Sequence, residues 1–315
     1  MRRSFISSVA AVAVAFVLVA CGGQAAPAAT VAPTAPPTNT PAPTNTPAPT
    51  STPAPTATSA ASGGDTAASG EAQQAVAAAM ANIEQAKSYR MSMVATVKGN
   101  LGEGIPGATA DKPFEFLNVE GVVSGKNSNF TMKGLVVSFL GGDPDTGIEF
   151  ATVNEKSYVR GPVPLLNANE DKWYILPADQ SSPAEQFGSA SVVKTFASED
   201  MDLSDFVVEG TESLDGQSCT IYAGDKEATM KAFSKSQGAE GLPSVDSLKE
   251  VDQASLKFYI CDDDLLHRMA LSFIGTPEDQ TDKLEINLDV NLNEFGKSFT
   301  IEEPTDAQPI ATPTP

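Results

Sequence analysis

Apolar and polar side chains alternate without interruption in the segment Leu284-Glu285-Ile286-Asn287-Leu288-Asp289-Val290-Asn291-Leu292-Asn293. Successive side chains of a β-strand point to opposite faces, so this pattern is typical of a strand with one buried and one solvated face. Sheets that leave one face in water are mainly antiparallel, because parallel sheets are covered on both faces. The segment therefore predicts an antiparallel sheet.

The same period of two recurs along the chain. In residues 89–98, Tyr, Met, Met, Ala and Val alternate with mainly polar side chains. Shorter segments with strand character are bounded by Gly, Asp, Asn and Pro, which are typical of turns. Further predicted strands are Phe116–Ser124, Asn129–Phe139, Ile148–Val153, Ser157–Arg160, Lys172–Leu176, Phe206–Gly210, Ser218–Ala223, Ala254–Cys261, Leu265–Ile274 and Ser298–Ile301.

Three other segments have helical patterns. Residues 76–83 place apolar side chains three and four positions apart, as on one face of a helix. A capping box with proline at the first helical position begins a predicted helix at 182–196. Asp225 is suited to cap a third helix that ends near Gly238. About ten strands and a few helices, without regular βαβ order, predict an α+β domain with a curved antiparallel sheet around the helices.

The N-terminus has the features of an export signal. Arg2 and Arg3 precede an apolar stretch that is too short to span a bilayer. The stretch ends in Leu18-Val19-Ala20-Cys21, which matches the bacterial lipobox. We therefore expect residues 1–20 to be a lipoprotein signal peptide and Cys21 to carry the lipid that anchors the protein to the membrane. The alternatives are an ordinary signal peptide or a buried helix. The anchor predicts an extracytoplasmic location, at the cell surface or in the periplasm.

A stalk follows the anchor. Residues 21–70 are rich in Pro, Thr, Ala and Ser and repeat the hexad Thr-Asn-Thr-Pro-Ala-Pro from Thr38 and Thr44. No apolar face exists at any period, so we expect this segment to be disordered. In polyproline II conformation, at ~3.1 Å per residue, it would reach up to ~140 Å from the membrane. We expect one domain at 71–304 and a disordered tail of similar composition at 305–315.

Charge excludes one class of partner. The 315 residues include 20 Lys and Arg against 40 Asp and Glu, a formal net charge of -20. Affinity for nucleic acid comes mainly from Lys and Arg that neutralise phosphates, so nucleic acid is not an expected partner. The same excess of carboxylates disfavours electrostatic docking on anionic lipid headgroups.

Several short motifs in the domain resemble one family. They are Tyr158-Val159-Arg160, Trp173-Tyr174-Ile175, Phe258-Tyr259-Ile260-Cys261-Asp262, Leu266-His267-Arg268, the strand 284–292 and Glu294-Phe295-Gly296. Together they resemble the LppX/LprAFG lipoproteins and the wider LolA-like fold. Cys261 departs from the family pattern, which has an aromatic-aliphatic-aspartate run at that point.

The resemblance implies a half-open barrel of antiparallel strands, closed by helices over an apolar cavity that binds a lipid or acyl chain. Methionine suits such a cavity because it is flexible and adapts to irregular shapes. The candidate cavity residues are Met91, Met93, Phe116, Met132, Phe139, Tyr158, Trp173, Phe187, Phe196, Met230 and Phe233. The alternative is that these residues fill a packed core and the protein binds a protein partner, as in envelope sensing.

Cys219 and Cys261 remain after Cys21 is lipidated. They form an even pair in a compartment where disulfides persist, and both lie on predicted strands. We therefore predict a Cys219–Cys261 disulfide. The alternative is two unpaired buried thiols.

We expect neither catalysis nor a cofactor. The chain contains no Gly-x-Ser-x-Gly, His-Glu-x-x-His, P-loop or Rossmann motif. Its single histidine, His267, is expected at a sheet end with a local hydrogen bond, and an enzymatic role is the alternative. The acidic segments 142–149 and 262–264 lack the spacing of an EF-hand loop, so solvated turns are expected in place of a calcium site. No metal ligand is predicted.

Overall fold

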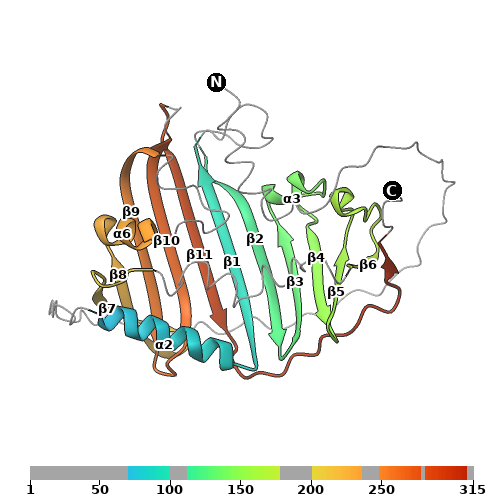
Figure 1. Ribbon diagram of the computed structural model, residues 1–315, viewed down its shortest axis with the longest axis horizontal. Helices are drawn as coiled ribbons and strands as arrows, with labels where there is room; N and C mark the ends of the chain where they lie inside the picture. Colours follow the sequence, from blue (N-terminus) through green and yellow to red (C-terminus); the bar gives the residue numbers. More distant parts are fainter. Residues whose placement is uncertain (1–69, 100–111, 178–200, 236–247, 278–280, 311–315) are drawn as a thin grey trace, which may run out of the picture. The chain divides into compact units, whose positions relative to one another are not determined.

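Twelve strands form one sheet in the part of the chain that the structure describes (Figure 1). The computed structural model describes residues 70–99, 112–177, 201–235, 248–277 and 281–310. The predicted signal peptide, Cys21, the stalk up to residue 69 and the predicted helix at 182–196 lie outside these residues.

The elements follow the predicted segments closely. The strands are β1 (Ser88–Lys98), β2 (Phe114–Ser124), β3 (Asn127–Lys133), β4 (Ile148–Val153), β5 (Lys156–Arg160), β6 (Trp173–Ile175), β7 (Val207–Leu214), β8 (Gln217–Gly224), β9 (Leu248–Cys261), β10 (Leu266–Pro277), β11 (Leu284–Asn293) and β12 (Gln308–Pro309). The helices are α2 (Glu71–Gln85), α3 (Leu135–Phe139) and α6 (Lys226–Lys235), with a 3-10 turn, η1 (Pro164–Leu166).

The sheet is built from two runs of sequential strands. The order is β12-β6-β5-β4-β3-β2-β1-β11-β10-β9-β8-β7, and neighbours are antiparallel except for the parallel pair β12 and β6. The two runs meet where β1 pairs with β11, from Arg90↔Asn293 to Lys98↔Glu285. The predicted α+β class with a curved antiparallel sheet is confirmed, with twelve strands in place of about ten. The sheet ends at β12 and β7 and does not close into a barrel.

Helix α2 lies across one end of the sheet. It buries Val76, Ala79, Met80 and Ile83, which are the positions that the sequence pattern predicts, and it contacts β9 and β10. Burial of a Val or Ile side chain of this kind stabilises a domain by about 1.5–3 kcal/mol. The helix ends at Gln85, and the extended backbone of Ala86 leads directly towards β1.

The predicted strand at Asn129–Phe139 is only half correct. The strand ends at Lys133, and Leu135–Phe139 forms α3. Gly134 separates the two with φ 92°, and a Cβ atom at this position would lie 2.9 Å from the Phe116 carbonyl oxygen. A short apolar run fits a strand and a buried helix equally well, so periodicity alone does not distinguish them.

The C-terminal segment is the second correction. Residues 298–301 are not a strand, and residues 305–310 are ordered although the sequence predicts a disordered tail from residue 305. In Figure 1 this segment runs below the sheet and ends beside β6. Ile301 and Ala307 pack against side chains of β4 to β6, and the Ile310 amide donates to the Ile175 carbonyl. The apolar contacts of Ile301 and Ala307 hold this segment against the sheet.

A carboxylate fixes the same segment. Glu303 accepts hydrogen bonds from Tyr158 Oη at 2.5 Å, Lys156 Nζ at 2.9 Å and Asn154 Nδ2 at 3.1 Å. These bonds, the one from Tyr158 foremost, lower the pKa of Glu303 to about 2. Residues near the C-terminus are thus joined to the turn between β4 and β5.

Candidate ligand-binding face

Rows of apolar side chains cross the inner face of the sheet, which is the face against which α2, α3 and α6 pack. The central row takes one residue from each of β8, β9, β10, β11, β1, β2, β3 and β4, in register. These residues are Tyr222, Phe258, Met269, Val290, Met93, Val119, Met132 and Ile148. All are buried, and Tyr222 is the most exposed at 8%.

Two more rows flank the central one. Towards α2 the residues are Leu292, Met91, Gly121, Phe130, Phe150, Val159 and Tyr174. Towards the opposite end they are Leu256, Leu271, Leu288, Ala95 and Leu117. The three rows contain no charged residue, so their chemistry is that of apolar contact.

Methionines lie at regular intervals in the middle of this layer. Met93 is separated from Met269 by Val290 and from Met132 by Val119. Methionine is unbranched and polarizable, so a surface of this kind adapts to an irregular apolar partner.

Gly121, in the row towards α2, leaves space for the ring of Phe130. A Cβ atom at Gly121 would lie 2.3 Å from Phe130 Cδ1 and 2.2 Å from the Asn129 carbonyl oxygen. The Phe130 ring therefore covers Gly121 directly, which only a residue without a side chain permits.

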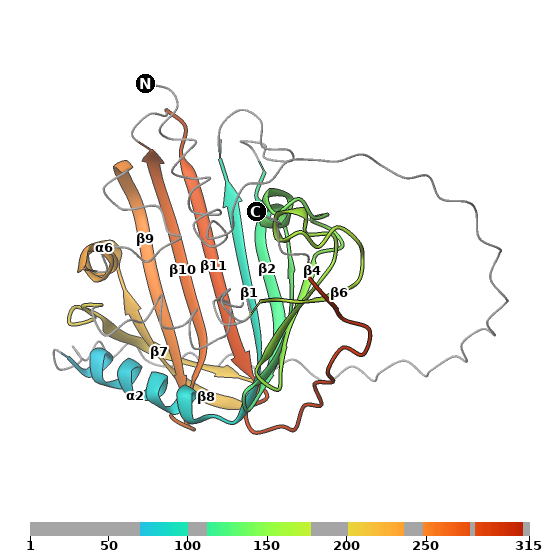
Figure 2. The same ribbon diagram turned by 45° about the vertical axis from the view of Figure 1, so that its right-hand side comes forward.

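The described helices lie towards the margins of the inner face. Helix α2 contacts β9 and β10, α6 contacts β8 and β9, and α3 contacts β2 and β3. In Figure 2 no described helix crosses the middle of β1 and β11, where Met93 is located.

Helix α6 is attached to the sheet by polar contacts as well as by packing. Asp225 Oδ1 accepts a hydrogen bond from the Ala228 amide, which confirms the predicted cap. Thr229 is 1% exposed, and its hydroxyl donates to the Gly224 carbonyl and accepts from the Leu256 amide. The buried residues Ala228, Thr229 and Ala232 of this helix are all small, and the helix contacts β8 and β9.

A buried histidine and a solvent-exposed aspartate pair at the sheet end where α2 ends. His267 is 5% exposed, its Nε2 is 3.1 Å from Asp263 Oδ2, and its ring packs edge-on against Phe295. Burial raises the pKa of Asp263, but hydrogen bonds from His267 and Gln217 outweigh this effect and lower it. Burial raises the pKa of Tyr89, which contacts Phe295, to about 12. The predicted local hydrogen bond of His267 is confirmed by the contact with Asp263. The imidazole ring itself is buried.

The predicted cavity residues do not all lie in one place. Met91, Met93 and Met132 belong to the inner rows, and Phe116, Phe139 and Phe233 pack against the same cluster. Met230 is half-buried on α6 and lies outside that cluster, because Ala228 and Ala232 form the buried stripe of the helix. Phe187 and Phe196 lie outside the described residues.

Tyr158 and Trp173 are corrections, because they lie on the outer face. They pack with Ile301 under the C-terminal segment, whereas Val159 points to the inner face. Adjacent residues of a strand point to opposite sides, so a shift of one residue in the interpretation of β5 exchanges the two faces.

Sequence reasoning missed several central residues. Four residues of the central row and of the row towards α2 were not predicted, and each is 3% exposed or less: Phe130, Phe150, Phe258 and Met269. The alternation within their predicted strands is the signal that places them on the buried face.

The predicted Cys219–Cys261 disulfide is present. The two residues are directly opposite each other on β8 and β9, and the Asp262 amide beside them donates to the Ser218 carbonyl. This makes the cysteines a non-hydrogen-bonded pair, where the side chains of antiparallel strands approach most closely.

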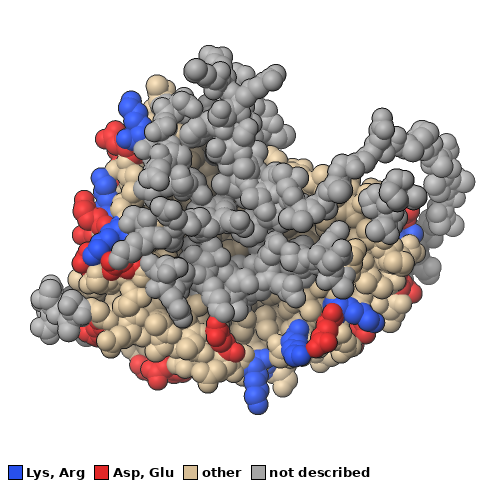
Figure 3. Space-filling model, in the orientation of Figure 1, with Lys and Arg blue, Asp and Glu red and all other residues tan. Residues whose placement is uncertain are grey.

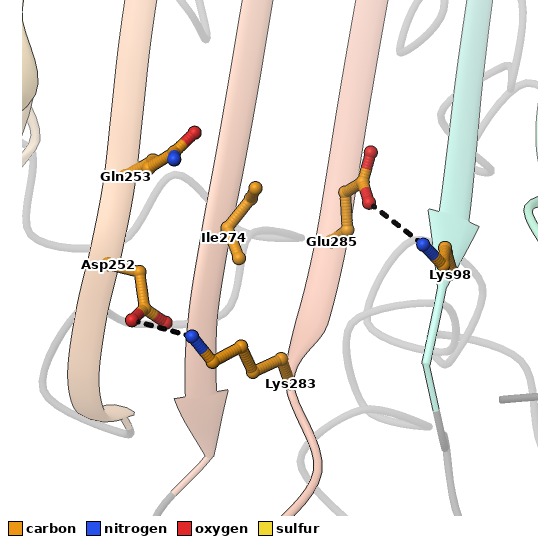
Figure 4. Close-up of a pocket in the computed structure, with 6 residues that line it drawn as sticks. All are labelled: Lys98, Asp252, Gln253, Ile274, Lys283 and Glu285. Carbon is orange, nitrogen blue, oxygen red and sulfur yellow. Dashed lines mark hydrogen bonds and ion pairs between the residues drawn. The ribbon is translucent and has the colours of Figure 1, made fainter. Parts of the chain in front are cut away.

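A polar hollow of about 470 Å³ lies on the outer face (Figure 4). It is lined by Lys98, Asp252, Gln253, Ile274, Lys283 and Glu285. Lys283 Nζ is 2.9 Å from Asp252 Oδ1, and Lys98 Nζ is 3.7 Å from Glu285 Oε2. Each ammonium group thus has a carboxylate partner, and the hollow is unsuited to an apolar ligand.

The acidic turn at 142–149 has ordinary turn hydrogen bonds. Asp143 Oδ1 accepts from the Asp145 and Thr146 amides. Within the described residues, no three His, Cys, Asp or Glu side chains gather as a metal site would require. The same part of the chain contains no helix with the length and apolar character needed to cross a bilayer.

No family model matches the chain, and no curated protein matches it. Among solved structures, the chain is similar to LprF from Mycobacterium bovis, with 17% identity over 74% of this chain and 97% of that one and a TM-score of 0.39. It is also similar to the lipoprotein LppX from Mycobacterium tuberculosis, with 13% identity over 73% and 97% of the two chains and a TM-score of 0.38. LprF and LppX carry the names of the lipoprotein group that the sequence motifs resemble.

A third similar structure is a DUF1329 family protein from Desulfovibrio piger. It has 10% identity over 72% of this chain and 94% of that chain, with a TM-score of 0.24.

Proposed function

We propose that this protein is an extracytoplasmic lipoprotein, anchored to the membrane through Cys21, whose domain binds a lipid or other hydrophobic molecule without catalysis. The observation that supports binding most directly is the inner face of the sheet. Three uncharged rows run across up to eight strands, with methionines at the centre and the described helices towards the margins. Such a layer offers a long, adaptable apolar surface to an acyl chain.

The anchor is supported by the sequence Leu18-Val19-Ala20-Cys21 and by the stalk that follows it. A diacylglycerol with a further acyl chain holds a protein stably on a membrane. The stalk would then place the domain outside the cytoplasm, within reach of membrane lipids.

Binding of a protein partner by a packed domain is the second candidate. The observation that favours it is the burial of Met91 and Met93, which are 0% and 3% exposed. If these side chains fill their space completely, no acyl chain has room beside them, and the protein acts through its surface.

Native mass spectrometry of the full chain, followed by organic extraction, distinguishes the two candidates. Under the binding proposal the parent chain releases lipid. Met93→Trp, which enlarges the side chain at the centre of the rows, should reduce the lipid about tenfold or more. Val94→Trp is the matched control, because its side chain is on the outer face of the same strand. Met93→Leu, which nearly conserves volume, should bind like the parent.

Two results would contradict the binding proposal. One is an extract without lipid from the parent chain, also after incubation with phosphatidylcholine vesicles. The other is an equal loss of lipid in Met93→Trp and Val94→Trp while circular dichroism shows the native sheet in both.

A further inference from the structure

The two ends of the inner face differ in polarity. At the end where β1 begins, at the bottom of Figure 1, one row crosses β1 to β5 in register. Its members are Tyr89, Val123, Ser128, Thr152 and Ser157. All but Val123 carry a hydroxyl group. We call Tyr89, Ser128, Thr152 and Ser157 the hydroxyl row.

The row at the opposite end is apolar throughout. It crosses β9, β10, β11, β1 and β2 in register and consists of Ala254, Phe273, Ile286, Val97 and Phe114. Val97 and Leu284 form a buried cluster at this end, and Phe114 and Ile286 pack against it. The inner face therefore has a direction, with apolar rows along most of its length and polar side chains at one end.

Two buried polar atoms at the polar end have no hydrogen-bond partner within the described residues. They are Thr152 Oγ1 and His267 Nδ1. His267 is 5% exposed, and its ring packs against Phe295, as does that of Tyr89, with ring centroids 5.1 and 5.9 Å apart respectively. Buried polar groups are nearly always hydrogen-bonded, so two such atoms at one end of the face indicate a partner that these residues do not supply.

The chemistry of this end fits an uncharged partner. A hydroxyl group both donates and accepts, and in a neutral His267 the donation from Nε2 to Asp263 leaves Nδ1 as an acceptor. A buried phosphate or carboxylate would need a cation beside it. Lys126, in the turn between β2 and β3, pairs with Glu155 at 2.8 Å, and Lys87 is exposed. Figure 3 shows charged side chains of both signs along the lower edge of the molecule.

We propose that the hydroxyl row binds the uncharged polar headgroup of a lipid, and that the acyl chain extends from there along the apolar rows. The inference rests on the proposed binding of a lipid on the inner face, and it adds the class of headgroup and the direction of the ligand. An acylglycerol headgroup supplies both missing partners. Its ester carbonyl accepts from Thr152 Oγ1, and its hydroxyl group donates to His267 Nδ1.

The apolar rows are long enough for this arrangement. From Tyr89 to Val97, β1 rises about 26 Å at about 3.3 Å per residue. An acyl chain spans about half of the ~30 Å hydrocarbon core of a bilayer. A chain whose headgroup lies at the hydroxyl row therefore ends within the inner face.

The test compares two lipids that have the same chain and different headgroups. Monooleoylglycerol is uncharged, whereas oleate carries a carboxylate at pH 8. Tritium-labelled lipid that stays with the delipidated full chain on gel filtration measures binding. We expect the parent chain to bind monooleoylglycerol at least about fivefold more tightly than oleate, because hydroxyl groups without a cation favour the uncharged headgroup.

Thr152→Val tests the row itself. Valine nearly conserves the shape and removes Oγ1, so the affinity for monooleoylglycerol should fall about threefold to tenfold, with little change for oleate. Because Oγ1 has no partner among the described residues, thermal unfolding should occur at the parent temperature or above. Thr131→Val, on the outer face of β3, is the matched control and should bind like the parent. Ser128→Ala is the second variant of the row and should act in the same direction as Thr152→Val.

The outcomes separate this inference from the proposed function. A parent chain that binds neither lipid refutes lipid binding, and the assignment of the hydroxyl row with it. A parent chain that binds both lipids equally well, or binding of monooleoylglycerol that is unchanged in Thr152→Val and Ser128→Ala, refutes the assignment of the row and leaves lipid binding intact. An equal loss in Thr131→Val would also overturn it, since that side chain is on the other face.

Discussion

Thr229 connects α6 to the sheet, and its replacement by valine tests how that helix is held. The hydroxyl donates to the Gly224 carbonyl at 3.1 Å and accepts from the Leu256 amide at 3.1 Å, and the residue is 1% exposed. Valine has nearly the same shape, so Thr229→Val leaves two backbone groups without these partners and creates little empty space.

The size of the effect follows from those two groups. A buried group that loses its partner costs about 1–3 kcal/mol. For the carbonyl and the amide together we expect the free energy of unfolding to fall by about 3 kcal/mol. For a domain of 150–250 residues this corresponds to a decrease in Tm of about 6–12 °C.

Urea unfolding followed by circular dichroism measures the change. Thr229→Ser is the control, since it keeps the hydroxyl and removes one methyl group, which costs about 0.8 kcal/mol. The slope of the free energy against urea should be the same in all three proteins. The reasoning is refuted if Thr229→Val loses less than about 0.5 kcal/mol, or if Thr229→Ser is the less stable variant.

Three further predictions concern the disulfide, the C-terminal segment and the inner rows. Replacing both Cys219 and Cys261 by serine should lower the free energy of unfolding by about 3–4 kcal/mol in urea titrations, because the bond closes a loop with a sequence separation of 42; no change would contradict this. The pKa of Glu303 is lowered to about 2 in the fold, so its stabilising effect is complete well above pH 4.5 and is lost as the pH falls towards 2. Glu303→Gln should therefore lower Tm at pH 7 and differ little from the parent near pH 2, and a difference that does not depend on pH would argue against the bonded carboxylate. Gly121→Ala should destabilise the domain by about 1–3 kcal/mol in thermal unfolding, because its methyl group would overlap the Phe130 ring, whereas unchanged stability would mean that the ring can move away.

Local patterns predicted most elements correctly. The alternation at 284–292 corresponds to β11, the spacing at 76–83 corresponds to the buried side of α2, and Asp225 caps α6. These features depend on residues within one or two turns of each other, so the chain specifies them over short distances. Prediction was wrong at residues 135–139, where a short apolar run fits a helix and a strand equally well.

The candidate site was only partly predictable. Strand alternation indicates two faces but does not say which face other segments cover, and at β5 this reversed the roles of Tyr158 and Val159. Composition predicts a disordered tail from residue 305, and it does not show the contacts that Ile301 and Ala307 make with β4 to β6.

The sequence by itself determined the acidic charge and the strand pattern, and it predicted the export signal and an even pair of cysteines, because each is a property of neighbouring residues or of composition. The tertiary structure decided which side chains share a face. Met93 and Met269 come into one row only because β1 pairs with β11, and the same pairing places Arg90 beside Glu294, 204 residues away in the chain. Registers between such distant strands are set by packing across the whole sheet, and no local period contains them.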